Sequence, residues 1–321
     1  MSREILTPYS YSDENFPENP ALPEGAREVR WQDSFGFGVA FKPDIVYAER
    51  DGEKLVISYL TPRNDRKDNP LIVFVQGSAW FRQDIYIHLP EMLRMCQKGY
   101  CVALVQYRPS TTAKFPAQTE DVKTAIRFLR ANAEKYRFDP SRVAIWGDSS
   151  GGHTALMVGF TGNDWPNAEE DSLSQPQAAA SSLGEGALGD ASVRCIVDWY
   201  GPTVVSEMGY EPSCGEHVSA DCPEGWLIGH LSVPENPELA AATVPQSYLR
   251  ADKPTPPTLI MHGSRDRTVN FQQSVHVYEA MRALGKEVEF VKVLGGDHGW
   301  RGFCCDEALD EVDAFLRKHL G

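Results

Sequence analysis

The sequence predicts an α/β protein with a mostly parallel central sheet and helices on both of its faces. Two runs of strand length, "PLIVFVQ" at 70–76 and "YCVALVQY" at 100–107, are continuously apolar, as parallel strands buried on both faces are. From there to the C-terminus, strand-like and helix-like segments alternate. Such alternation favours crossover connections within one sheet, because parallel neighbours cannot be joined by tight turns.

The individual elements follow from local patterns. Residues 45–61 contain two short strands of a hairpin, which the Asp-Gly of "RDGE" joins. Residues 120–136 form a helix, because apolar residues recur every three or four positions from Val122 to Leu129. The remaining expected elements are strands at 142–147, 193–201, 258–263 and 288–294, and helices at 151–160, at 271–285 and near the C-terminus.

The chain of 321 residues is expected to form a single domain over 1–321, because no flexible linker divides it. Residues 1–40 are interpreted as an N-terminal arm that covers the site, extends the sheet or pairs two subunits into a homodimer, and composition leaves these three alternatives open. Residues 162–192, rich in Ala, Ser, Gly and Glu, are interpreted as a mobile insertion. The Pro-rich residues 201–250 are interpreted as a small cap.

The composition excludes several classes of partner. A net charge of −14 and a pI near 5.0 are unfavourable for binding nucleic acids and anionic membranes, which need clustered Lys and Arg. We therefore expect no nucleic-acid and no membrane partner, but a small molecule or a neutral polymer. The N-terminal residues lack the apolar core of a secretory signal, and the seven cysteines are an odd number. Both features indicate a cytoplasmic protein with reduced thiols.

The motif Gly147-x-Ser149-x-Gly151 lies where a predicted strand passes directly into a helix. Glycines two positions on either side let the strand and the helix pack closely, and the central serine is then forced outward in a strained turn. The N-terminus of the following helix directs free N–H groups at negative charge that develops on a bound substrate. The bare pattern also occurs by chance, so its strand–turn–helix context is what predicts a nucleophile at Ser149.

A serine nucleophile needs a base that takes its proton and a carboxylate that orients the base. On an open α/β sheet, these groups are expected in loops after later strands, in the order serine, acid, histidine. Asp266 and His298 each follow a predicted strand in that order, so we predict a catalytic triad of Ser149, Asp266 and His298. Helix capping by Asp266 and a structural role for His298 are the alternatives. Asp297 is a weaker candidate for the acid, and Asp148 is expected to stabilise the turn.

The loop "FVQGSAW", after the predicted strand at 70–76, is expected to supply donors for an oxyanion. We predict an oxyanion hole made of the N–H groups of Ser78 and Ala79 together with that of Ser150, directly after the nucleophile. Gly77 permits the turn. The alternative is an ordinary strand-to-helix loop.

Three tryptophans are predicted to bind substrate: Trp80 after the oxyanion loop, Trp300 after the histidine base, and Trp226 in the cap. Core packing is the alternative for each of them. The segment "CGEHVSADC" at 214–222 holds two cysteines and a histidine, but a fourth ligand is missing, so we expect a solvated cap loop there rather than a zinc site. No metal and no other cofactor is expected for the reaction.

These segments resemble α/β-hydrolase serine esterases, similar to the hormone-sensitive-lipase-like group and to bacterial feruloyl and acetyl-xylan esterases. The resemblance runs from about residue 70 to the C-terminus and includes "VQGSAW", "GDSSGGHTA", "DWYGPT", "HGSRDRTV" and "GDHGW". It implies the α/β-hydrolase fold and the same triad. One departure is that Gln76, Gly77, Ser78 and Ala79 stand where relatives have His-Gly-Gly and a small residue. The Cβ atoms at positions 78 and 79 narrow the space beside the oxyanion, which disfavours bulky tertiary-alcohol esters.

The predicted function is that of a serine carboxylesterase for short-acyl or hydroxycinnamoyl esters, carbohydrate esters among them, acting through an acyl-enzyme intermediate. One alternative is an amidase similar to kynurenine formamidase, which uses the same triad and shares the oxyanion loop ending in tryptophan. The other is a non-catalytic small-molecule receptor similar to the gibberellin receptors. Those receptors keep the glycine turn but lack the histidine base, whereas His298 is present here.

Overall fold

The computed structural model describes residues 23–28, 38–50, 52–163, 189–210, 212–299 and 302–321. The chain divides into two units, residues 1–35 and residues 36–321. In the first unit, the described residues contain a turn in which the N–H of Ala26 donates to the carbonyl of Pro23. Most of the expected N-terminal arm and most of the expected insertion at 162–192 lie outside the described residues. The interpretation of 1–321 as one domain with an arm and a cap stays a prediction.

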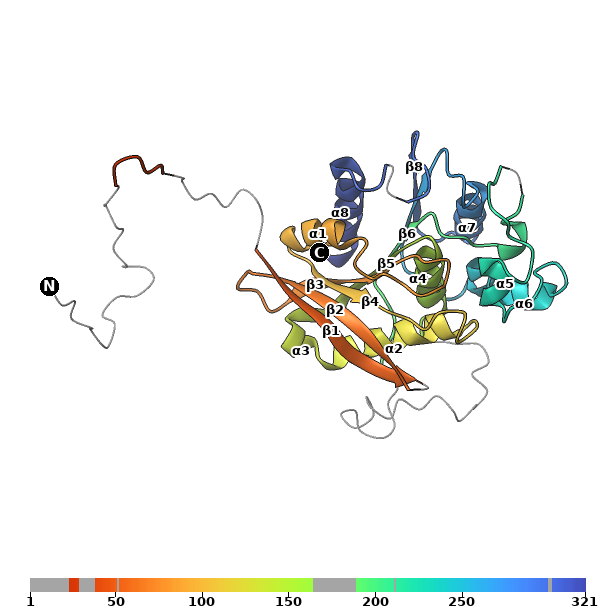
Figure 1. Ribbon diagram of the computed structural model, residues 1–321, viewed down its shortest axis with the longest axis horizontal. Helices are drawn as coiled ribbons and strands as arrows, with labels where there is room; N and C mark the ends of the chain where they lie inside the picture. Colours follow the sequence, from red (N-terminus) through yellow and green to blue (C-terminus); the bar gives the residue numbers. More distant parts are fainter. Residues whose placement is uncertain (1–22, 29–37, 51, 164–188, 211, 300–301) are drawn as a thin grey trace. The chain divides into compact units, whose positions relative to one another are not determined.

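An eight-stranded sheet forms the centre of the second unit, in the order β1-β2-β4-β3-β5-β6-β7-β8 (Figure 1). The pairs β1–β2 and β2–β4 are antiparallel, and every other neighbouring pair is parallel. The predicted mostly parallel sheet is thus confirmed, although the first hairpin is longer than expected. The strands are β1 Val39–Arg50, β2 Glu53–Pro62, β3 Asn69–Val75, β4 Cys101–Val105, β5 Phe138–Asp148, β6 Cys195–Trp199, β7 Thr258–Gly263 and β8 Val288–Val293.

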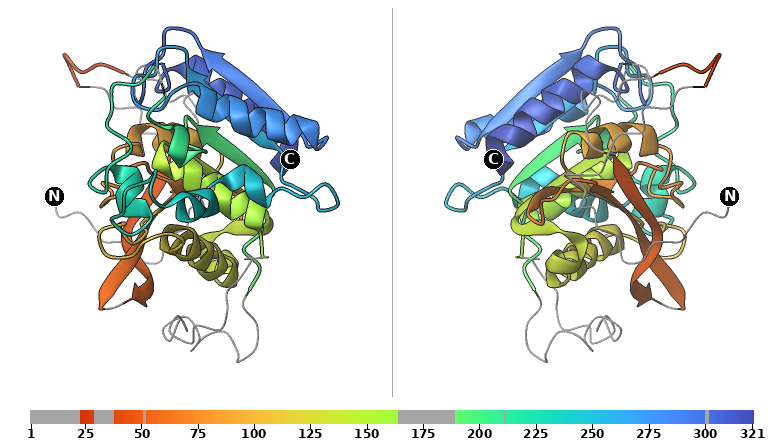
Figure 2. Two further views of the ribbon diagram at one scale, coloured as in Figure 1. Left: turned by 90° about the vertical axis from the view of Figure 1, so that its right-hand side faces the viewer. Right: turned by 90° about the vertical axis from the view of Figure 1, so that its left-hand side faces the viewer.

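Helices cover both faces of the sheet, as the sequence predicts (Figure 2). Alternate residues of β3 face opposite sides: Leu71 and Val73 pack in one apolar core with α2, α4 and α7, and Ile72 and Phe74 pack in the other with α1 and α8. The helices are α1 Leu89–Gln97, α2 Ala117–Ala131, α3 Ala133–Tyr136, α4 Ser150–Thr161, α5 Pro223–Leu227, α6 Pro237–Ala242, α7 Gln272–Ala283 and α8 Asp306–Leu320, with short 3₁₀ turns η1 Val205–Glu207 and η2 Pro245–Tyr248.

The single helix expected at 120–136 is divided into α2 and the short α3. The break lies at Asn132, whose backbone angles of φ −118° and ψ 21° are not helical. Its side-chain amide donates to the carbonyl of Phe128 at 2.8 Å, which satisfies an acceptor at the end of α2. The apolar periodicity continues across this break, and therefore periodicity alone cannot locate it.

The segment at 201–250 contains η1, α5, α6 and η2 between β6 and β7. These short elements bury a small apolar cluster of their own, which also includes Trp80 from the loop after β3. Cluster members are Trp80, Val205, Cys222, Leu227, Ile228, Val233 and Ala240. Among the described helices, none combines the length and the apolar character that crossing a bilayer requires.

The backbone is packed most tightly where β5 turns into α4 beside the end of β3. A Cβ atom at Gly151 would overlap the carbonyl oxygen of Val75, and one at Gly147 would overlap the carbonyl of Gly151. A Cβ at Gly77 would lie 2.7 Å from the Cβ of Ser149. Because all these contacts involve main chain or a fixed Cβ, the turn tolerates only glycine at these positions.

Asp198, on β6, is a buried carboxylate behind the start of α4. One carboxylate oxygen accepts the N–H of Gly201 at 3.0 Å, and the other has no hydrogen-bond partner among the described residues. Burial raises the pKa of Asp198 to about 7, although the bond from Gly201 opposes this shift. Between the ordinary pKa and this value, the folded chain keeps a proton that the unfolded chain has lost.

Replacement of Gly151 by Ala is expected to lower the free energy of unfolding by about 3 kcal/mol, because the Val75 carbonyl belongs to the sheet and cannot move aside. Urea unfolding measures the change. Gly209→Ala is the matched control, since a Cβ there has only ordinary contacts, at 3.5 Å from Val218 and 3.9 Å from His217. Equal free energies of unfolding for G151A and G209A would contradict the close contact of Gly151 with the Val75 carbonyl.

The stability contribution of Asp198 is complete below its ordinary pKa and is lost as the pH rises through about 7. Asp198→Asn removes this titration, so the variant should gain stability relative to the wild type as the pH rises from 4 to 8. About 1.4 kcal/mol accompanies each unit of pKa difference, which puts the gain at a few kcal/mol. Denaturant unfolding at a series of pH values measures it, and parallel curves for the two proteins would refute the prediction.

Candidate active site

Ser149 occupies the turn between β5 and α4 with backbone angles φ 52° and ψ −127°. A positive φ is costly for a residue with a Cβ atom, so surrounding contacts must hold it. The N–H of Ser149 donates to the carbonyl of Trp199 on β6 at 2.8 Å, and its own carbonyl accepts the N–H of His153 at 3.1 Å. These bonds fix the half-buried serine at the C-terminal edge of the sheet.

The loops after β7 and β8 bring Asp266 and His298 to Ser149. The Nε2 of His298 lies 2.9 Å from the Ser149 hydroxyl, and the Nδ1 lies 2.8 Å from a carboxylate oxygen of Asp266. With its proton on Nδ1, the imidazole donates to Asp266 and accepts the hydroxyl proton of Ser149. The Asp266 side chain is fully buried and that of His298 is 20% exposed, so the imidazole lies nearer to solvent than the carboxylate.

The Asp266 carboxylate is held in its ionised form. One oxygen accepts the N–H groups of Thr268 and Val269 at 2.9 and 2.8 Å, and the other lies 3.3 Å from His262 as well as near His298. Burial raises the pKa of Asp266, but hydrogen bonds from His262 and His298 outweigh it and hold the pKa well below its ordinary value. A carboxylate of this kind stabilises an imidazolium on His298.

Asp297, the weaker candidate for the acid, has other partners. Its carboxylate lies 2.7 Å from the guanidinium Nε of Arg267, and it accepts the backbone N–H of His298 at 2.8 Å. Of the two aspartates, only Asp266 has a hydrogen bond to the imidazole of His298 within the described part of the chain. Asp297 therefore braces the loop that carries His298.

Tyr200 packs edge-on against the imidazole of His298, with ring centroids 4.7 Å apart and an interplanar angle of 60°. The tyrosine follows β6, is fully buried and has a φ of 45°. This contact limits rotation of the imidazole away from Ser149. The position of Tyr200 after a predicted strand suggests a place among the aromatic residues near the site, but it gives no signal of the contact with the imidazole of His298.

The predicted oxyanion donors have different surroundings. The N–H of Ser78 donates to the Ser150 hydroxyl at 2.9 Å, so it is not free for an oxyanion, and this corrects the expectation for Ser78. The N–H of Ala79 makes no hydrogen bond to a described residue. Ser150 is the first residue of α4, and the N–H groups of a first helical turn have no partner within the helix. Ala79 and Ser150 are thus the available donors.

Asp148 connects the turn at Ser149 with the loop after β3. One of its carboxylate oxygens accepts the N–H of Gly77 at 2.8 Å, and the other lies 3.3 Å from Nε2 of His88. Burial disfavours a charged imidazole, but the neighbouring side chains of Asp148, Cys304 and Glu91 favour it and raise the pKa of His88 to about 11. His88 escapes detection in the sequence because it belongs to no motif.

The three tryptophans predicted to bind substrate have separate locations. Trp80 is 2% exposed, and its indole N–H donates to Nδ1 of His153 at 3.2 Å, so it packs in the small cluster at 201–250. Burial lowers the pKa of His153 to about 4, which keeps that acceptor neutral. Trp226 is half-buried and stacks on His230 at 3.9 Å between ring centroids. Trp300 lies outside the described residues.

The segment 214–222 does not gather its cysteines and histidine around one point. His217 pairs with Glu224 at 3.0 Å, and the sulfur of Cys222 accepts the N–H of Gly225 at 3.2 Å. Cys214 is exposed. Within the described residues, these three side chains do not form a group with the spacing of metal ligands.

Comparisons with known proteins identify a family that this sequence matches. Residues 58–281 match the BD-FAE family profile. The esterase LipC of Mycobacterium tuberculosis is 30% identical over 236 residues, which cover 73% of this chain and 54% of LipC. The chain spans about half the length of the curated relatives it matches.

Two solved structures share the fold over most of the chain. A truncated carbohydrate esterase from gut microbiota is 28% identical with a TM-score of 0.73, covering 89% of this chain and 98% of that one. A bifunctional GH43-CE protein of Bacteroides eggerthii is 31% identical with a TM-score of 0.75, covering 88% of this chain and 35% of that one. The α/β-hydrolase fold and the likeness to bacterial esterases are thereby confirmed. Because the family profile matches well over half of its residues, the chain belongs to the BD-FAE family.

Proposed function

We propose that the protein is a serine carboxylesterase that hydrolyses short-acyl or hydroxycinnamoyl esters, carbohydrate esters among them. The observation that carries the proposal is the continuous hydrogen-bonded chain from the Ser149 hydroxyl through His298 to Asp266, at 2.9 and 2.8 Å. Further support comes from the relative LipC, which is named an esterase, and from the structural neighbour named a carbohydrate esterase.

The proposed reaction has two acyl-transfer steps. His298 removes the proton from Ser149, whose oxygen attacks the ester carbonyl, and the imidazolium is stabilised by Asp266. The imidazolium then gives its proton to the departing alcohol, which leaves an acyl group on Ser149. Water repeats the sequence with His298 again as the base, releasing the acid and free Ser149. Residues of the chain supply every proton transfer in these steps.

Two backbone N–H groups are proposed to stabilise the oxyanion, those of Ala79 and Ser150. Each donor that is placed before charge develops contributes several kcal/mol, of the order of 3 kcal/mol for a single group. The Cβ of Ala79 lies on a residue with a φ of 54°, at a position where relatives with a glycine would have no side chain. Linear alkyl and sugar esters are expected to fit beside it better than tertiary-alcohol esters.

Ser149→Ala should lower the rate of hydrolysis of p-nitrophenyl acetate by roughly 10⁴-fold or more while the fold persists, because no other group replaces the nucleophile. Ser247→Ala is the control, since Ser247 is exposed and its hydroxyl donates to the carbonyl of Val244 rather than to a group at the site. A fluorophosphonate should label the wild type and S247A at Ser149. Hydrolysis by S149A near the wild-type rate, or failure of the wild type to be labelled, would reject the proposal and favour the receptor alternative.

Asp266→Asn should lower kcat by about 10⁴-fold, because the amide holds the wrong tautomer of His298. Asp297→Asn should keep most of the activity, since Asp297 contacts Arg267 and backbone rather than the imidazole. Steady-state kinetics measures kcat of both variants. The substrates are acetyl, butyryl, octanoyl and feruloyl esters together with N-formyl and acetamido compounds, so the same experiment also identifies the substrate class. A larger loss of kcat in D297N than in D266N would show that Asp297, not Asp266, is the acid. A preference for N-formyl compounds would favour the formamidase alternative.

A further inference from the structure

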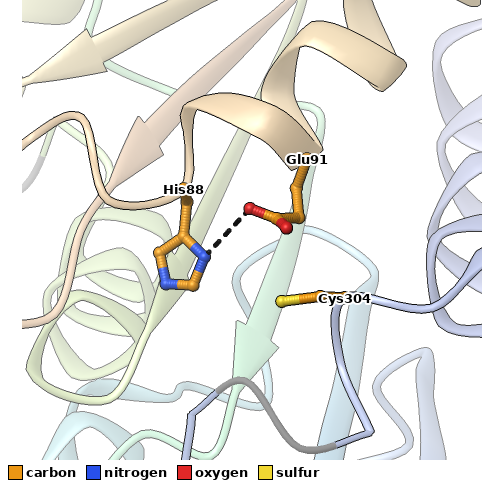
Figure 3. Close-up of side chains that lie close together, drawn as sticks. All are labelled: His88, Glu91 and Cys304. Carbon is orange, nitrogen blue, oxygen red and sulfur yellow. Dashed lines mark ion pairs between the residues drawn. The ribbon is translucent and has the colours of Figure 1, made fainter.

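Three potential metal ligands converge beside Asp148, the residue that precedes Ser149. His88 directly precedes α1, Glu91 lies in the first turn of α1, and Cys304 lies just before α8 (Figure 3). One ligand atom from each residue lies within 4.8 Å of the other two. His88 is 3% exposed and Glu91 is 7% exposed, whereas Cys304 is half-buried. The histidine and the carboxylate are therefore interior, and the cysteine is the most exposed residue of the three.

A buried nitrogen in this group has no hydrogen-bond partner. Nδ1 of His88 makes no hydrogen bond to any described residue, although it is directed at Glu91 (Figure 3). Its distance to the nearer carboxylate oxygen of Glu91 is 3.5 Å, which is longer than a charge-assisted hydrogen bond. Two ligands held tetrahedrally at about 2.0–2.1 Å from zinc lie about 3.3–3.4 Å apart. The observed separation therefore suits two ligands of one cation better than a direct bond.

The other nitrogen of the same imidazole has the partner that a metal-binding histidine needs. Nε2 of His88 lies 3.3 Å from a carboxylate oxygen of Asp148. Histidines that bind metals usually donate their second N–H to a carboxylate, which fixes the ring and strengthens the ligand. Asp148 thus orients Nδ1 toward Glu91 and Cys304.

We propose that His88 Nδ1, the Glu91 carboxylate and Cys304 Sγ bind a divalent zinc-class cation, with water as the fourth ligand. One nitrogen, one oxygen and one thiolate are a donor set typical of zinc, which is borderline-soft and tetrahedral. The imidazole and the thiol each lose a proton on binding. The carboxylates of Glu91 and Asp148 and the resulting thiolate offset the charge of the cation.

The proposed metal site is coupled to the turn that carries Ser149. Asp148, which orients His88, also accepts the N–H of Gly77 at 2.8 Å and immediately precedes Ser149. A cation on His88 therefore changes the charge next to the Asp148 carboxylate. It also changes the strength of the hydrogen bond that this carboxylate accepts from Gly77. Metal occupancy is expected to alter ester hydrolysis, but metal binding itself does not depend on the proposed function.

Cobalt(II) titration of the full-length chain tests the site, because a cobalt–thiolate bond absorbs in the near ultraviolet. The neighbouring cysteine supplies the control: Cys305 is exposed and does not belong to the group. Wild type and Cys305→Ser should bind one cobalt per chain with the thiolate band, and zinc should displace it. Cys304→Ser should lose the band and bind cobalt at least about tenfold more weakly. A band that persists in C304S, a band lost in C305S, or no binding by the wild type at micromolar cobalt would overturn the proposal.

A second variant covers the outcome in which Cys304→Ser does not fold, as judged by circular dichroism. Glu91→Gln keeps the thiolate and should keep the band, but with about tenfold weaker cobalt affinity. Unchanged affinity in E91Q would overturn the assignment of Glu91. Ser149→Ala should bind cobalt as the wild type does, so a failure of the metal site and a failure of the proposed esterase function give different results. Zinc should change hydrolysis by wild type and C305S more than by C304S.

Discussion

The close approach of main chain from β3, β5 and α4 is the constraint on which the other features of the site depend. With no Cβ atoms at Gly147 and Gly151, the helix begins directly at the end of the strand, and a Cβ at either glycine would overlap a backbone carbonyl. This crossing forces Ser149 into a positive φ at the edge of the sheet, where the loops after β7 and β8 also end. The hydrogen-bonded chain of Ser149, His298 and Asp266 follows from that edge, because parallel strands deliver their C-terminal loops to one side.

Local patterns were enough to predict the parts of the site that local backbone chemistry determines. The glycine spacing around Ser149, the order of Asp266 and His298, and the continuous apolar runs of the parallel strands each reflect one element and its turn. Features that depend on contacts between distant segments were not predictable in this way. The bond from the Ser78 N–H to the Ser150 hydroxyl joins residues that are 72 positions apart. The ion pair of His88 with Asp148 joins the loop before α1 to the turn at Ser149.

Trp80 illustrates the same limit for side chains. The sequence places it directly after the oxyanion loop, where an aromatic residue suits a substrate wall. Its indole instead packs in the cluster of the segment 201–250 and donates to His153, because those residues supply an apolar surface and a neutral acceptor. Position along the chain determines where the backbone of Trp80 lies, but the partners of its ring come from α4 and from a segment more than a hundred residues later.

The loop after β3 shows how tertiary contacts hold residues other than glycine at a positive φ. Ala79 and Trp80 have φ values of 54° and 57°, and each such residue with a Cβ costs about 1 kcal/mol relative to a right-handed conformation. Hydrogen bonds from Ser110 N–H to the Trp80 carbonyl, at 2.8 Å, and from the Gln83 side chain to the Gln76 carbonyl, at 2.9 Å, hold the loop on both sides. The Ser150 hydroxyl holds its centre through the Ser78 N–H. A loop fixed at three points keeps Ala79 and Trp80 in this conformation although neither residue is a glycine.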